Sequence, residues 1–253
     1  MPTLTCRCTR LALLALLLSS CASQHVPVDR VGASVYLRRD TDDITVLSPR
    51  VSASTTLGDA SGLEVAYTMD AWTGASIDIV TAASPHVDEL RHELSVGGYH
   101  ELDGFTVSGG YRHSRENDYI SNGGVANLSV DMADKNTTLA FSAFGGNDLV
   151  GRAGDPGFGR AQQSLGGRVA LTQVLNPKAL VQLSVERTRV GGYQSSPYRF
   201  VGIGGDGICA GSATLCIPEV HPGVRNRNAL VTRGRHALGD HGSLGLMHRF
   251  YFD

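Results

Sequence analysis

Apolar and polar side chains alternate with a period of two residues in run after run of this chain. From Leu63 to Ala71 every odd-numbered residue is apolar or aromatic, whereas the even-numbered positions include Glu64 and Asp70. Successive side chains of a strand point to opposite faces, so each run gives a sheet one apolar row and one polar row. Similar runs lie at 90–96, 105–112, 138–143, 164–172, 179–186 and 244–252, and less regular ones at 120–131 and 227–236. We therefore predict an all-β, antiparallel chain.

Strand length and connection length separate the two folds that fit this pattern. A soluble β-sandwich would bury the apolar row, whereas a membrane β-barrel turns it toward lipid. The runs last about 9–13 residues, the length of a tilted membrane-spanning strand, against about 5–6 in soluble sheets. Short connections at 58–62, 103–104, 133–136, 176–178 and 239–242 alternate with longer ones at 73–87, 115–119, 145–161 and 191–226. Because bacterial barrels alternate short turns with long outer loops, we predict an up-and-down transmembrane β-barrel with about 10–12 strands in this chain.

Charged residues fall on the polar row of these strands. An arginine on the lipid face at the bilayer midplane would cost about 2–4 kcal/mol, so a barrel keeps its charges inside. We predict that the following side chains face the lumen: Glu64, Asp70, Arg91, Glu93, Arg112, Arg168 and Glu186. The solvated face of a soluble sheet is the alternative. Aromatic residues near strand ends are candidates for girdles at the membrane interface, or for core packing: Trp72, Tyr99, Tyr119, Phe144, Phe250, Tyr251 and Phe252.

The first residues have the three parts of a secretory signal peptide. Arg7 and Arg10 precede the apolar segment 11–18, and small residues follow it. The segment is too short to span a bilayer as a helix. Its end, Leu-Ser-Ser-Cys at 18–21, resembles a lipobox, in which Cys21 would be acylated; ordinary cleavage a few residues later is the alternative. We therefore predict a signal peptide with a lipobox at 1–21 and a barrel domain at 22–253.

Two cysteines remain after the signal segment. Cys209 and Cys216 lie in one connection of an exported chain, and an oxidising compartment favours a disulfide between them. A metal-binding pair is the weaker alternative, because no second pair or histidine cluster completes a tetrahedral site.

Motifs for catalysis or cofactor binding are not convincing. Residues 202–207 read G-x-G-x-x-G, but a dinucleotide site needs a preceding strand and a following helix, and here Cys209 and Pro218 follow. The histidines form no H-E-x-x-H motif, and the chain has no G-x-S-x-G motif. Outer-membrane phospholipases place Ser and His on a barrel surface, so a lipid-acting enzyme stays open as an alternative. It is the weaker one, because no motif in this chain marks a nucleophile and its base. We predict no cofactor, no metal and no enzymatic activity. With a net charge of −2, nothing suggests a nucleic-acid partner.

Several segments resemble one known family. They are 67–93 (YTMDAWTGASIDIVTAASPHVDELRHE), 134–139 (DKNTTL), 150–158 (VGRAGDPGF), 171–177 (LTQVLNP), 192–201 (GYQSSPYRFV) and 247–252 (MHRFYF). In order along the chain, they are similar to the domain of unknown function 3570 (DUF3570) family of bacterial outer-membrane β-barrels. The resemblance implies outer-membrane lipid and the barrel-assembly machinery as partners, and no known activity.

The strand count departs from a complete barrel. Counting from about Val31 gives eleven strands, whereas single-chain bacterial barrels normally have an even number. Family members continue beyond the strand at 247–252, so we expect an incomplete barrel, truncated at its C-terminus. A misplaced first strand at 33–39, or a C-terminal strand signal formed by Phe250 and Phe252, would also account for the count. Three functions stay open: a pore or small-solute channel, a lipid-anchored barrel that binds partners through its outer loops, and the enzyme.

Acylation of Cys21 has a direct test. Cells expressing the full chain and fed a palmitate analogue should label the wild-type protein, because the acyl chain is attached through the Cys21 thiol. The Cys21→Ala variant should carry no label. An unlabelled wild-type protein that is exported normally would contradict the lipobox prediction.

Overall fold

The computed structural model describes residues 29–39, 45–73, 88–152, 155–196, 200–207, 209, 212–239 and 241–253. The predicted signal segment and Cys21 lie outside these residues. Within them, no helix is long and apolar enough to cross a membrane.

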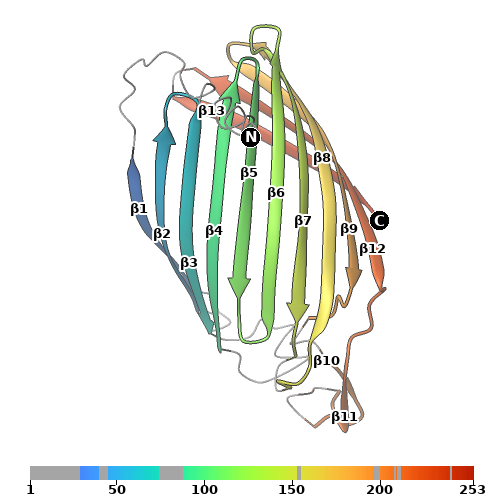
Figure 1. The fold of residues 1–253 in the computed structure, drawn as a ribbon. Helices are drawn as coiled ribbons and strands as arrows, with labels where there is room; N and C mark the ends of the chain where they lie inside the picture. The colour runs from blue at the N-terminus through green and yellow to red at the C-terminus, as the bar shows by residue number, and fades with distance from the viewer. Residues whose placement is uncertain are drawn as a thin grey trace, which may run out of the picture.

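Eleven strands form a single antiparallel sheet, in which each strand pairs with the next along the chain (Figure 1). They are β1 (Arg30–Arg39), β2 (Thr45–Leu57), β3 (Ser61–Thr73), β4 (Asp88–Leu102), β5 (Phe105–Arg115), β6 (Tyr119–Met132), β7 (Thr137–Val150), β8 (Arg160–Asn176), β9 (Ala179–Gly192), β12 (Val224–Leu238) and β13 (Gly242–Phe252). Between β9 and β12, β10 (Phe200–Ile203) and β11 (Leu215–Pro218) pair as a separate hairpin. The all-β up-and-down fold predicted from the sequence is confirmed.

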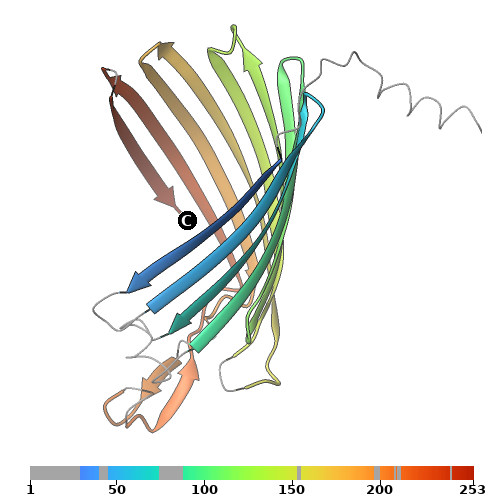
Figure 2. The same ribbon diagram turned by 90° about the vertical axis from the view of Figure 1, so that its left-hand side faces the viewer.

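The sheet bends into a trough that stays open along one side (Figure 2). Its two edges are β1 and β13, which do not pair with each other in the described part of the chain. Strands of 10 to 17 residues run the length of the trough. The described sheet is therefore a curved wall rather than a closed barrel.

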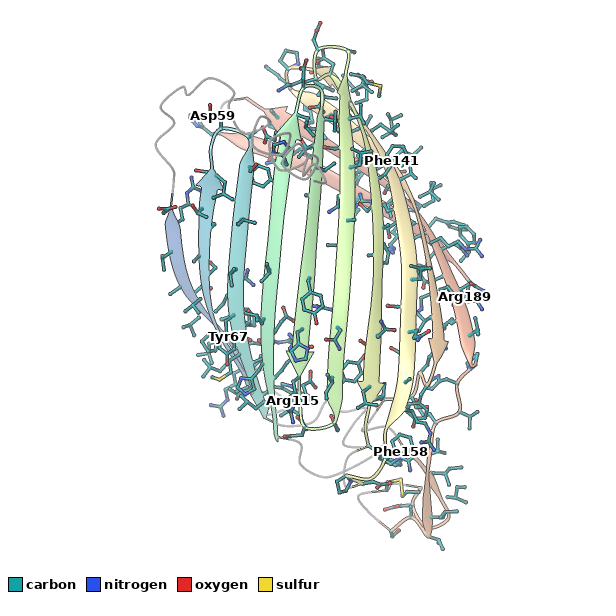
Figure 3. All side chains as sticks on the ribbon, viewed as in Figure 1. Asp59, Tyr67, Arg115, Phe141, Phe158 and Arg189 are labelled. Carbon is teal, nitrogen blue, oxygen red and sulfur yellow. A yellow bond between two sulfur atoms is a disulfide. The ribbon has the colours of Figure 1, made fainter. Side chains whose placement is uncertain are left out.

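Short turns lie at one end of the sheet and the longer connections at the other. The turn end includes Asp59, and the long-connection end includes Arg115 and Phe158 (Figure 3). Gly58, Gly104 and Gly239 have positive φ, which lets three of the turns reverse the chain tightly. The predicted alternation of connection length is wrong at one place. Only residues 116–118 join β5 to β6, because the hydrogen-bonded ladder continues to Arg115 and resumes at Tyr119.

The paired registers assign every strand residue to one of two faces. We call the face of Asp70 and Arg91 the charged face and the face of Leu63 and Val65 the apolar face. The hydrophobic residues that are buried all lie on the charged face: Ala66, Val150, Ala170, Val190, Ala229 and Val231. On the apolar face, large side chains are exposed, including Val31 at 87%, Leu165 at 71% and Leu246 at 75%. Burial in this sheet is thus the reverse of that in a soluble β-protein.

The aromatic residues do not form the predicted girdle as a group. Tyr99, Tyr119, Phe144 and Tyr251 share the charged face with Trp72, as their register positions show. The girdle interpretation is wrong for these five, because closeness to a strand end in the sequence does not determine the face on which a side chain lies. Phe250 and Phe252 lie on the apolar face, opposite Leu230 and Asn228 of β12.

Two of the inward aromatic rings cover glycines on neighbouring strands. The ring of Tyr99 lies over Gly62, and the ring of Phe144 lies over Gly166, its direct partner across the β7–β8 ladder. A Cβ atom at Gly166 would overlap this ring and lie 2.9 Å from the carbonyl oxygen of Arg187. Such ring-over-glycine pairs fill the space that the missing side chain leaves and help to fix the strand register.

Substituting Gly166 should therefore destabilise the sheet. Gly166→Ala forces both the Phe144 ring and the backbone of β9 to move, and overpacking of this kind costs about 1–3 kcal/mol. Gly234→Ala is the matched control, because nothing lies within 4 Å of a Cβ atom there. Urea unfolding in detergent micelles should show a lower midpoint for Gly166→Ala alone. Equal midpoints for the two variants would contradict the packing role of the ring.

Candidate functional site

The charged face lines a large cavity on the concave side of the trough. The cavity has a volume of about 940 Å³ and extends from Arg30 of β1 to Ser164 of β8. Glu64, Tyr99 and Arg112 project into it, and glycine and serine form much of its floor. Small residues keep this part of the face hollow, because they leave side-chain space unfilled. The concave, polar surface is the candidate functional site.

The structure brings all the charges predicted to share a face into ion pairs on this surface. Arg91 pairs with Asp70, its direct partner across the β3–β4 ladder, with Nε donating to Oδ2 at 2.8 Å. Arg168 lies 3.5 Å from Glu186, also its direct cross-strand partner. The remaining pairs are Arg112–Glu93 at 3.6 Å, Arg50–Glu64 at 3.3 Å and Arg249–Glu186 at 2.8 Å. Their side chains are partly exposed, so each contributes little stability, about 0–1 kcal/mol, and mainly favours the observed register.

Two of the partners could not be found from the sequence. Arg50 and Arg249 reach acids that are 14 and 63 residues away in the chain. Alternation identifies the face of a side chain, but only the three-dimensional order of the strands identifies its neighbour. The pair Arg249–Glu186 even spans β12, because the two residues oppose Val231 and Ala229 of that strand.

An acidic cluster lies at the long-connection end of the sheet. Carboxylate oxygens of Glu89, Glu116 and Asp118 all lie within 4.8 Å of one another. Glu89 is 8% exposed and accepts a hydrogen bond from the Asn117 side chain at 3.3 Å. Partial burial, with added repulsion from Glu89 and Asp118, raises the pKa of Glu116 despite the opposing attraction of Arg91. Carboxylates of this kind are ligands for Ca²⁺, which takes oxygen donors. The sequence did not reveal the cluster, because its members come from β4 and from the β5–β6 connection.

Hydrogen-bonded polar side chains interrupt the apolar face near the same end. The Tyr67 hydroxyl lies 2.6 Å from His92 Nδ1, and the Tyr111 hydroxyl donates to Asn122 Oδ1 at 2.7 Å. His113 Nδ1 lies 2.9 Å from the same Asn122 oxygen. The polar band consists of these five residues, and the apolar face continues from it toward the short turns.

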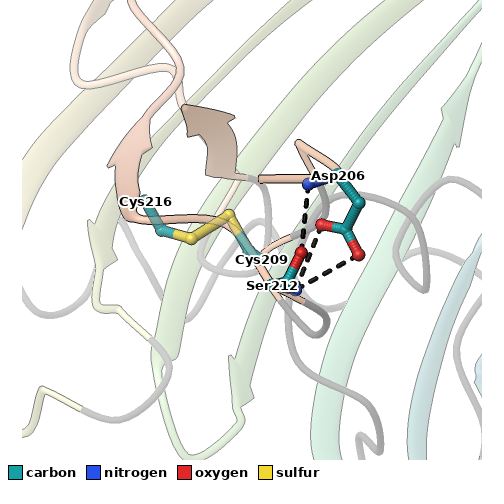
Figure 4. Close-up of a disulfide and its surroundings, with 4 residues drawn as sticks. All are labelled: Asp206, Cys209, Ser212 and Cys216. Atoms are coloured by element: carbon teal, nitrogen blue, oxygen red, sulfur yellow. Dashed lines mark hydrogen bonds between the residues drawn. A yellow bond between two sulfur atoms is a disulfide. The ribbon is translucent and has the colours of Figure 1, made fainter. Parts of the chain in front are cut away.

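The hairpin β10–β11 carries the two remaining cysteines. Cys209 and Cys216 are joined in a disulfide, with their Cα atoms 5.7 Å apart (Figure 4). The backbone N–H of Ser212 donates to the Asp206 carboxylate at 3.1 Å, and the backbone N–H of Asp206 donates to the Ser212 hydroxyl at 3.1 Å. The G-x-G-x-x-G stretch at 202–207 belongs to β10 and to this turn, and no helix follows among the described residues. The arrangement fits a cross-linked loop and lacks the helix N-terminus that a dinucleotide site requires.

The fold and its two faces define a class: a curved, up-and-down antiparallel sheet with a charged concave face and an apolar convex face. Residues 78–159 and 159–253 match the family described as "Protein of unknown function (DUF3570)", and the chain belongs to this family. No curated protein and no solved structure matches the chain. The resemblance stated from the sequence is confirmed.

The acidic cluster makes stability depend on pH. Folding raises the pKa of Glu116, so the protonated carboxyl group stabilises the folded state relative to the ionised one. This contribution to the free energy of unfolding is fully present below the ordinary glutamate pKa of 4.5 and is lost as the pH rises through the pKa of the folded state. Glu116→Gln should therefore be more stable than wild type at neutral pH. The variant should also lose less stability than wild type as the pH rises from acidic to neutral. The measurement is the urea midpoint across the acidic and neutral range, with the exposed Glu101→Gln as control. Parallel wild-type and Glu116→Gln profiles would contradict the role of Glu116.

Proposed function

We propose that this chain forms the wall of an outer-membrane β-barrel whose lumen passes small hydrophilic solutes. The observation that carries the proposal is the inverted burial, with hydrophobic residues exposed on the convex face and ion pairs on the concave face. Exposure of the convex face to water would be unfavourable, because removing apolar surface from water stabilises a protein by about 25 cal/mol per Å². Soluble monomers rarely expose apolar patches larger than roughly 300–600 Å². Lipid is the solvent that suits this face.

Strand length and the polar band support a membrane boundary near the long connections. A tilted strand needs about 9–11 residues to cross a bilayer. The strands β2–β9 have 11 to 17 residues, so their ends extend beyond the apolar region. Tyr67, Tyr111 and their partners have an apolar ring or stem with a polar tip, which suits the lipid headgroup level. Arg187 and Arg189 also lie on the convex face, in the part of β9 that approaches the long connection. There, an arginine costs only about 0–1 kcal/mol.

The two open edges need partners in this proposal. Lipid cannot hydrogen-bond the free N–H and C=O groups along β1 and β13. We propose that further strands pair along these edges when the lumen is completed in the membrane. The start of β1 lies at the short-turn end, which faces the periplasm in bacterial barrels. An acyl chain on Cys21 would therefore enter the inner leaflet of the outer membrane, where it would act as an additional anchor.

A second candidate function is partner binding through the outer connections. The observation that favours it is the hairpin β10–β11, which is cross-linked by Cys209–Cys216 within the longest connection of the sheet. A cross-linked loop loses less conformational entropy on binding than a flexible one. Deleting residues 200–218 would abolish partner capture under this second proposal and leave conductance intact under the first.

The pore proposal predicts ionic conductance. Full-length protein, refolded in detergent and shown to be folded by its heat-modifiable migration, should produce discrete current steps in planar bilayers, because the charged lumen remains wet. Protein that has been boiled before addition is the control. Folded protein that enters the bilayer and gives no current steps would contradict the proposal.

A further inference from the structure

The charges of the concave face are unevenly distributed. On β2–β5, each arginine of the described ion pairs has an acid beside it: Arg50 with Glu64, Arg91 with Asp70 and Arg112 with Glu93. This side of the trough carries alternating positive and negative groups. Opposite charges at such short separations largely cancel each other's field at a distance.

The β12 side is different. Its charged face carries arginines at positions 225, 227, 233 and 235, with the buried residues Ala229 and Val231 between the two pairs. We call Arg225, Arg227, Arg233 and Arg235 the arginine row; all four are exposed. Neither β12 nor the neighbouring β13 contains an Asp or a Glu. The row cannot be neutralised by residues of its own strand or of β13.

Few acids on other elements reach the row. Arg225 pairs with Asp253 at 3.2 Å, and Arg235 donates to the Ser243 hydroxyl at 3.3 Å. Glu186 of β9 is already shared between Arg168 and Arg249. Arg227 and Arg233 have no acidic partner among the residues that the structure describes. The two therefore add uncompensated positive charge to the concave face.

The row also borders a hollow of its own. Arg233 and Arg235 line a cavity of about 400 Å³ together with Gln182, Gly245 and Met247. Gln182 already donates to the Thr172 hydroxyl at 2.9 Å and accepts from Arg168 at 3.0 Å, so its polar atoms are held in place. The other walls of this hollow are Leu180, Leu246, Met247 and two glycines, so its polar groups are the two guanidinium groups and the Gln182 amide. Charged donors beside such a hollow suit the binding of a small anion.

We infer that the arginine row makes the lumen selective for small anions over cations. The inference rests on the pore proposed above and names the class of solute that the pore prefers. Arginine-lined constrictions favour anions, and a cleft with low-dielectric walls strengthens the field of uncompensated charges. The paired charges of β2–β5 oppose this effect only weakly, because their fields cancel.

The test is the reversal potential of the full-length protein in planar bilayers under a KCl gradient. Wild type should show a chloride preference. Arg227→Gln/Arg233→Gln should lower the chloride-to-potassium permeability ratio by about twofold or more, because two unpaired lumenal charges are removed. Arg187→Gln/Arg189→Gln is the matched control, because it removes the same charge from the convex face and should leave the ratio unchanged. The single variant Arg233→Gln should give a smaller shift in the same direction and serves if the double variant does not fold.

The possible outcomes separate the two proposals. A pore that conducts without preference, or that prefers potassium, overturns the inference and leaves the pore standing. Equal shifts in the two double variants also overturn it, because the effect would then come from net charge rather than from the lumen. Absence of any current from folded protein overturns the pore, and anion selectivity with it. Weaker chloride preference at about 1 M than at about 0.1 M salt would support the inference, because salt screens the arginine row.

Discussion

The two-residue period of the hydrogen-bonded β-ladder is the constraint on which the rest of this structure depends. Each strand from β2 to β9, together with β12, is paired on both sides, so two neighbours fix its register. A slip by one residue in β4 would move Arg91 into the apolar row and Leu90 into the charged row. The direct pairs Asp70–Arg91 and Arg168–Glu186 and the ring-over-glycine contacts resist such slips. Separation of the two faces is therefore a property of the whole sheet rather than of any one strand.

The centres of the strands could be predicted from the sequence, whereas their ends could not. Residues alternate at 63–71 and 179–186 because the two faces of each strand meet different environments, one apolar and one polar. Near some strand ends apolar and polar residues no longer alternate, so the period fades although the backbone ladder continues. For this reason residues 145–150, which include Gly145, Asn147 and Asp148, looked like a loop, yet they pair with β8 as far as Arg160. The hairpin β10–β11 was missed for a similar reason, since strands of four residues carry too little periodicity.

From the sequence, the face of a side chain can be predicted, whereas the residues beside it cannot. Glu64, Arg112 and the other predicted charges share the concave face because residue parity determines the face along a regular strand. Their partners depend on strand order and side-chain reach, which a single sequence does not contain. Parity would also have placed Tyr99 correctly, since it has the same parity as Arg91 and Glu93 on β4. The acidic cluster of Glu89, Glu116 and Asp118 depends on the geometry of a three-residue connection, for which alternation carries no information.

The contrast between the paired charges of β2–β5 and the arginine row of β12 has a consequence for dipolar solutes. In a completed lumen, one wall would carry charges of both signs and another an excess of positive charge, so an electric field would lie across the channel axis. A molecule bearing separated positive and negative groups, such as a free amino acid, would be turned with its carboxylate toward β12. Orientation of this kind restricts rotation before passage. It would make permeation depend on the distance between a solute's charges as well as on its size.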